Sequence, residues 1–192
     1  MTDQPNILAF AGSTRTDSYN KKLVKIAAAG AEAAGAVVTY VDLRDLPMPL
    51  YDGDLEAQSG LPDNARVFKA LLRSHQGLLI ASPEYNSSLP PVLKNAIDWA
   101  SRPEVNDPPL AVLADKVAAI MSTSPGALGG LRGLVALRSL LGNIRILVIP
   151  DQVAIPKADE AFDGSGQLRD PKQQESICRL GQKVTYLLRK LQ

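Results

Sequence analysis

Five short apolar runs, separated by segments with helical spacing, constrain the fold of this chain more than any other feature. The runs are almost continuously apolar rather than alternating, which is typical of parallel strands covered on both faces. They lie at Ile7–Ala11, Val37–Val41, Gly77–Ala81, Val117–Met121 and Ile144–Ile149. The alternation of such strands with helices predicts an α/β fold built on an open, doubly wound sheet.

The segments between the runs carry apolar residues at helical spacing. One such helix contains Leu23, Ile26 and Ala27, another contains Leu93, Ala96 and Ile97, and the last stripe runs over residues 177–191. In 192 residues, this pattern predicts a single domain over 1–192, with a flavodoxin-like five-stranded parallel sheet in the order 2-1-3-4-5 and helices on both faces. Two long segments, 43–62 and 150–171, are rich in Pro, Gly and Asp and are expected to be irregular.

Charge and composition argue against several classes of protein. The 21 basic and 20 acidic residues leave a net charge of +1, and no basic stripe is present, so nucleic acid is not an expected partner. No run approaches about 18 apolar residues, and the first residues lack the pattern of a signal peptide, so we expect no membrane segment and a cytoplasmic location. With one histidine and one cysteine, no metal site or catalytic triad is expected: His75 fits a helix cap, and Cys178 fits packing.

Ligands of open α/β sheets bind beyond the carboxyl ends of the strands, which directs attention to three loops. The first, GSTRTDSYN, leads from the first strand into a helix, where backbone N–H groups and the helix dipole attract an anion. Its hydroxyl, amide and guanidinium donors favour a single phosphate monoester, and the alternative is ordinary helix capping by Ser18 or Asp17. The loop contains neither GxGxxG nor a Walker motif.

The second and third loops make the pattern specific. SPEYN follows the third strand and is followed in turn by LPPVLKNAIDWASR, and STSPGALGG follows the fourth strand. Together with GSTRTDSYN, these motifs resemble the NAD(P)H-dependent FMN reductase family, which includes quinone, azo-dye and chromate reductases. The resemblance extends from the first strand to about Leu141. Pro125 and Pro91 depart from the family pattern and affect the expected shape of the pocket mouth more than flavin binding.

The resemblance implies a set of flavin-binding residues and no catalytic side chain, because FMN carries the chemistry. The phosphate would be held by Ser13, Arg15, Ser18 and Asn20, with Tyr19 at the same turn. The isoalloxazine would lie against Pro83, Glu84, Tyr85 and Asn86, largely through their backbone, and the pocket would be completed by Ser124 and Gly126.

The function implied is hydride transfer from NADPH or NADH to FMN, followed by electron transfer to a small acceptor in a ping-pong cycle. The acceptor would be free flavin, a quinone, an azo dye or a metal oxyanion, and the protein would be a homodimer or homotetramer. The apolar helix around Leu131–Leu141 fits burial in such an assembly, and Trp99, beside Asp98 and Arg102, suits a subunit contact. Two alternatives are a flavodoxin-like electron carrier and a non-catalytic, regulatory flavin-binding protein.

Overall fold

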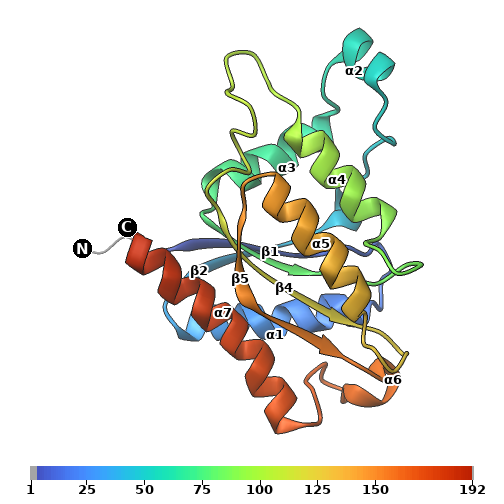
Figure 1. Cartoon of the computed structure of the whole chain (residues 1–192), viewed down its shortest axis with the longest axis vertical. Coiled ribbons are helices and arrows are strands. Elements are labelled where there is room, and N and C mark those ends of the chain that lie inside the picture. The colour runs from blue at the N-terminus through green and yellow to red at the C-terminus, as the bar shows by residue number, and fades with distance from the viewer. Residues whose placement is uncertain (1–3, 192) are drawn as a thin grey trace.

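A computed structural model describes residues 4–191 and contains one five-stranded parallel sheet in the order β2-β1-β3-β4-β5 (Figure 1). The strands are β1 (Asn6–Ala11), β2 (Val37–Asp42), β3 (Gly77–Ala81), β4 (Val117–Thr123) and β5 (Leu147–Ile155). Ile7 pairs with Val38 on one side and with Gly77 on the other, which fixes β1 in the interior of the sheet. The predicted fold class is confirmed.

Helices cover both faces of this sheet, as Figure 1 shows. Two of them, α1 (Tyr19–Ala33) and α7 (Pro171–Leu191), pack on the side chains of Ile7 and Ala9. The other face buries Leu8 and Phe10 under α3 (Asp63–Ser74), α4 (Pro91–Ser101) and α5 (Leu131–Asn143). Successive residues of β1 therefore serve opposite cores, which explains why the strand is apolar throughout.

The contact between α1 and α7 is made by glycines. A Cβ on Gly30 would lie 2.2 Å from the Cys178 carbonyl oxygen, and a Cβ on Gly181 would lie 2.0 Å from the Ala27 carbonyl oxygen. The two helix backbones therefore approach more closely than any other residue type would allow. Cys178 is partly buried at this contact, with its Sγ 3.7 Å from the Ile26 oxygen, which confirms its predicted packing role.

The prediction for the fifth strand is wrong in its limits. The chain turns at Arg145, where φ is +64°, and β5 begins at Leu147 and continues through Pro150 to Ile155. Pro150 lies in this edge strand where the register with β4 shifts, between the pairs Ala118–Val148 and Ile120–Gln152. A proline, which interrupts a ladder in a central strand, is accommodated at such an irregularity. The segment 150–171 is thus partly strand, and it also holds the one-turn α6 (Ala158–Ala161).

The segment 43–62 also contains regular structure that was not predicted. It begins with a 3-10 turn, η1 (Leu43–Asp45), and includes α2 (Gly53–Ser59). The Asp52 carboxylate caps α2 by accepting from the Asp54 N–H at 2.8 Å. No residue of α2 is buried, so this helix has no apolar stripe that the sequence could reveal.

The same segment covers Trp99, and the predicted subunit contact of this residue is therefore wrong. Trp99 is fully buried within the chain, donates from Nε1 to the Pro49 carbonyl at 2.8 Å, and packs edge-on against Tyr51 with ring centroids 5.0 Å apart. Its neighbours Asp98 and Arg102 pair with Lys94 and Glu56 rather than with each other.

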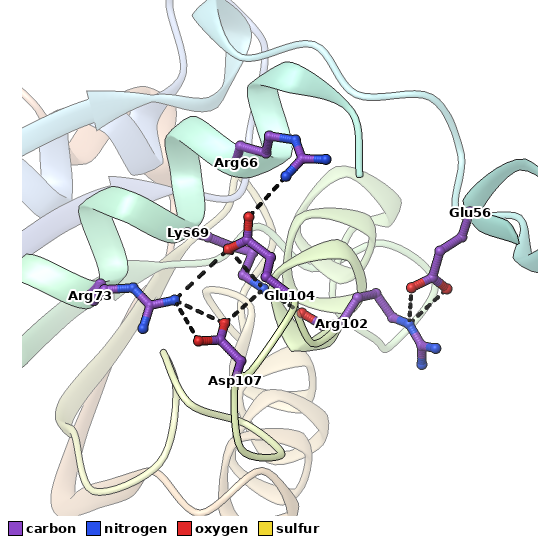
Figure 2. Close-up of polar contacts among 7 residues, drawn as sticks. All are labelled: Glu56, Arg66, Lys69, Arg73, Arg102, Glu104 and Asp107. Carbon is purple, nitrogen blue, oxygen red and sulfur yellow. Dashed lines mark hydrogen bonds and ion pairs between the residues drawn. The ribbon is translucent and has the colours of Figure 1, made fainter. Parts of the chain in front are cut away.

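A cluster of charges fixes the connection after α4 onto α3 (Figure 2). Arg66 pairs with Glu104 at 3.0 Å, Arg73 pairs with Asp107 at 2.9 Å, and the buried Lys69 donates to the Arg102 carbonyl. The cluster extends along α3 from its first turn to its last, and none of its residues lies in the three candidate loops.

Candidate functional site

The three loops predicted from the sequence meet at the carboxyl edge of the sheet and enclose a cavity of about 120 Å³. Most of the predicted residues line it, together with Pro125, which was expected to shape the pocket mouth, and Thr123, which the sequence did not indicate. The lining residues are Ser13, Arg15, Ser18, Tyr19, Asn20, Pro83, Glu84, Tyr85, Thr123, Ser124 and Pro125. Asn86 and Gly126 lie in the same loops but are not among the lining residues.

The loop after β1 presents uncommitted donors at the start of α1. Ser18 occupies the N-cap position but makes no side-chain cap bond, and the first turn of α1 contains no acidic residue. Capping therefore does not account for the Ser18 hydroxyl. Among the described residues, the Arg15 guanidinium donates only to the Asp17 carbonyl, at 3.2 Å, and the Arg15 N–H donates to Ser13 Oγ at 3.3 Å. This end of α1 is suited to a dianionic phosphate.

Asn20 holds two walls of the cavity together. Its Nδ2 donates to the Thr123 carbonyl at 2.9 Å, and its Oδ1 accepts from the Thr123 N–H at 3.1 Å. The Thr123 hydroxyl in turn donates to the Ile155 carbonyl at 2.9 Å. The amide of Asn20 thus fixes α1 to the end of β4, and only its second Nδ2 hydrogen is left for a ligand.

Tyr19 lies at the outer wall of the cavity. Its ring stacks on that of Phe162, with centroids 5.7 Å apart and an interplanar angle of 16°. The stack joins the start of α1 to the segment after α6, although the two are far apart in sequence. Tyr19 therefore shapes the cavity by packing.

The loop after β3 contains a tight hairpin turn. The Tyr85 N–H donates to the Ser88 carbonyl at 2.9 Å, and the Ser88 N–H donates to the Tyr85 carbonyl at 3.0 Å. The two central residues, Asn86 and Ser87, have φ values of +51° and +64°, as a type I′ turn requires. Asn86 therefore shapes the turn that carries Tyr85, a residue that lines the cavity and is half exposed.

Glu84 connects this loop to the start of α5. Its carboxylate accepts from the Gly133 N–H at 3.0 Å and from Arg132 Nε at 2.9 Å. Burial of the carboxyl raises its pKa, but the hydrogen bonds from Gly133 and Arg132 outweigh this effect, so the pKa of Glu84 lies below its usual value. Glu84 is therefore a charged helix cap, and its carboxylate is not poised to take up a proton near neutral pH.

The glycine-rich loop after β4 brings the chain back sharply from strand to helix. Gly129 and Gly130 have φ values of +61° and +90°, and a Cβ on Gly130 would lie 1.9 Å from Ser122 Oγ. The Ser124 N–H donates to the Ile155 carbonyl at 3.3 Å, and the Gly126 carbonyl accepts from the Gly129 N–H at 3.2 Å. The loop thus keeps Ser124 at the cavity while α5 starts close behind it.

The remaining candidates lie elsewhere. His75 follows α3, where its N–H donates to the Leu72 carbonyl at 3.3 Å and its Nε2 is 2.8 Å from Thr39 Oγ1, so its predicted capping position is confirmed. In residues 4–191, the structure shows no group of three or more His, Cys, Asp or Glu that could hold a metal ion. Across the same range, no helix is long and apolar enough to cross a membrane.

Comparisons with known proteins show which family this chain resembles in sequence and in fold. Residues 5–160 match the family model described as NADPH-dependent FMN reductase. Over 192 residues the chain is 36% identical to an NAD(P)H-dependent FMN reductase of Pseudomonas aeruginosa, which covers 100% of this chain and 99% of that protein. Over 163 residues it is 38% identical to a 2-hydroxy-1,4-benzoquinone reductase of a Burkholderia species, with 84% of each chain covered. Among solved structures, FerB of Paracoccus denitrificans, a flavoenzyme NAD(P)H:(acceptor) oxidoreductase, superposes with a TM-score of 0.80 and 28% identity, covering 97% of this chain and 98% of that one.

Proposed function

Because this chain belongs to the NADPH-dependent FMN reductase family, we propose that it uses one FMN in the cavity at the carboxyl edge to pass electrons from a nicotinamide cofactor to a small acceptor. The single observation that carries this proposal is the cavity itself. Ser18 lines it with a hydroxyl that makes no cap bond, beside the hairpin turn after β3 and the glycine-rich loop after β4.

The residues at the start of α1 would hold the phosphate of FMN. Ser13, Arg15 and Ser18 supply donors there, while Asn20 holds the wall through Thr123 and contributes at most its second amide hydrogen. The whole chain would form one FMN-binding domain.

The loops after β3 and β4 would line the isoalloxazine. Pro83, Glu84 and Tyr85 form one side through the backbone, with Asn86 shaping the turn. Ser124 and Gly126 would complete the pocket. Glu84 is already engaged by Arg132 and Gly133, which supports a backbone role for this segment.

Bound FMN supplies the redox chemistry, because it accepts a hydride from a nicotinamide and delivers electrons to an acceptor. The loops around the cavity would bind and orient the ring, exclude water from it, and offer backbone N–H donors to it. The nicotinamide and the acceptor would occupy the same binding face in turn, which gives a ping-pong cycle. Free flavin, quinones, azo dyes and metal oxyanions are the proposed acceptors.

A homodimer or homotetramer is the proposed assembly. Leu131 and Val135 on α5 are 42% and 63% exposed, although both are large and apolar. They lie on the helix that begins at the flavin cavity, so a second subunit covering them would also approach the cavity mouth. The cytoplasmic location stays a prediction.

The proposal is tested by recording the absorbance spectrum of the FMN-loaded protein before and after anaerobic addition of NADPH. We expect rapid loss of the oxidised-flavin absorbance, and its return when a quinone is added. A flavodoxin-like carrier would retain FMN but react slowly with NADPH. A regulatory protein would give no turnover at all, and either result would contradict the proposal.

A further inference from the structure

A second cavity, of about 220 Å³, lies beside the loop that follows β1. It is lined by Thr14, Leu43, Arg44, Leu46, Pro47, Met48, Val92, Asn95 and Ala96. No residue lines both this cavity and the proposed flavin cavity. The two nevertheless share the loop after β1, because Thr14 lines one and its chain neighbours Ser13 and Arg15 line the other.

The walls of this second cavity are apolar apart from a few groups. Asn95 is already committed, since its Oδ1 accepts from the Tyr51 N–H at 2.8 Å and its Nδ2 donates to the Pro49 carbonyl at 2.9 Å. Arg44 is the one charged residue of the lining. The cavity thus combines an apolar surface with a single cation.

Arg44 is held in place without a counterion. It lies in η1, where its N–H donates to Asp42 Oδ1 at 3.0 Å, and its guanidinium donates to Thr16 Oγ1 and to the Thr14 carbonyl. The other oxygen of Asp42 pairs with Lys21 at 2.6 Å. Within residues 4–191, no carboxylate lies within ion-pair distance of the Arg44 guanidinium. Its position is therefore fixed while its charge is left for a ligand.

We propose that this second cavity binds the phosphorylated adenosine end of NADPH, with Arg44 contacting the 2′-phosphate, and that Arg44 makes the enzyme prefer NADPH to NADH. The inference rests on the proposed function. A group in this cavity would lie apart from the proposed flavin site, because no residue lines both cavities. Of the proposed substrates, the dinucleotide is the one that carries a long part remote from the hydride, and such a part supplies binding energy. The apolar wall fits an adenine ring.

The test removes the charge of Arg44 and keeps a hydrogen-bond donor. Arg44→Gln can still donate to the Thr14 carbonyl or the Thr16 hydroxyl, so the loop stays tied. On the FMN-loaded protein, calorimetric titration with adenosine 2′,5′-bisphosphate should give a Kd about tenfold higher in Arg44→Gln than in the parent, as expected for one lost charge-assisted contact. The Kd for 5′-AMP should not change.

Steady-state kinetics provide the second measurement. KM for NADPH should rise by about the same factor, with kcat and the KM for NADH unchanged, because the contact is made equally before and during hydride transfer. Arg44→Lys should restore most of the preference. Arg145→Gln is the matched control, since Arg145 is exposed at the opposite edge of the sheet and its loss lowers the net charge equally.

Three results would overturn the inference. Equal affinity of the parent for the bisphosphate and 5′-AMP would show that no 2′-phosphate site exists. Weaker binding of FMN but not of riboflavin in Arg44→Gln would assign Arg44 to the flavin phosphate. Equal losses for NADPH and NADH would reduce Arg44 to a loop tether. Failure of the proposed function is distinct, because it would appear as an absence of NADPH oxidation in the parent, whereas the titrations need no turnover.

Discussion

Replacing Arg15 by Ala should weaken FMN binding and leave riboflavin binding nearly unchanged. In the structure, the Arg15 guanidinium makes one hydrogen bond, to the Asp17 carbonyl, and lines the cavity at the start of α1. A hydrogen bond to a charged partner contributes about 1.5 to 3 kcal/mol. Loss of the contact should therefore raise the Kd for FMN by about one to two decades. Riboflavin lacks the phosphate and should lose almost nothing.

The measurement is a fluorescence titration of the flavin-free protein with each ligand at two salt concentrations. The effect of Arg15→Ala on FMN should shrink at high salt, because the arginine is exposed and its charge is screened. Arg145→Ala, remote from the cavity, controls for the change in net charge. Equal losses for FMN and riboflavin, or an equal loss in the control variant, would refute the assignment of Arg15 to the phosphate.

Three further predictions concern the loops and the covering segment. Asn86→Pro should abolish flavin retention, because φ at this residue is +51° and proline requires about −65°, whereas Asn86→Gly should retain it; absorbance after gel filtration decides. Glu84→Gln should keep FMN and most of the hydride-transfer rate in stopped-flow experiments. Because folding lowers the pKa of Glu84, its ionised carboxylate stabilises the folded protein above the usual value of 4.5, and this stabilisation is lost as the pH falls. The free energies of unfolding in urea of the parent and of Glu84→Gln should therefore become equal in acid. A difference that stays constant with pH would contradict the helix cap. Trp99→Ala should cost about 3 to 5 kcal/mol of unfolding free energy without changing the sedimentation coefficient of the folded protein, and a shift in assembly would restore the interface interpretation.

The sequence predicts the helices and strands that have a periodic apolar pattern. It misses features that depend on a single contact between segments far apart in the chain. β3 is predicted to the residue because its apolar run is continuous and is flanked by the polar residues Gln76 and Ser82. The predicted limits of β5 are wrong because a proline, taken from the sequence alone, indicates the end of a strand, whereas an edge strand can contain Pro150. Trp99 appears surplus on its own helix, and only the return of the segment around Pro49, whose carbonyl accepts its indole N–H, explains its burial.

In the candidate site, too, some features could be predicted from the sequence and others could not. The three loops that line the proposed flavin cavity follow from the strand order, since parallel strands end at one edge of the sheet, whereas the individual residues were implied by the family resemblance. The second bond of Asn20 to Thr123 and the helix cap formed by Glu84 join segments far apart in sequence, and no local pattern encodes them. Arg44 is an exposed residue of a short 3-10 turn that carries no motif, so the sequence carried no signal for it.

The glycine contact between α1 and α7 means that neither helix can move away without breaking its packing on the other. The proposed phosphate site lies at the start of α1. At Gly30 and Gly181 the two helix backbones are in direct contact, so no side chain between them can adjust to a shift of either helix. An opening that frees α7 must therefore expose the flank of α1, and a ligand that binds only the closed form suppresses that opening by mass action. Amide hydrogens in the last helix, remote in sequence from every flavin loop, should exchange more slowly with deuterium once FMN is bound.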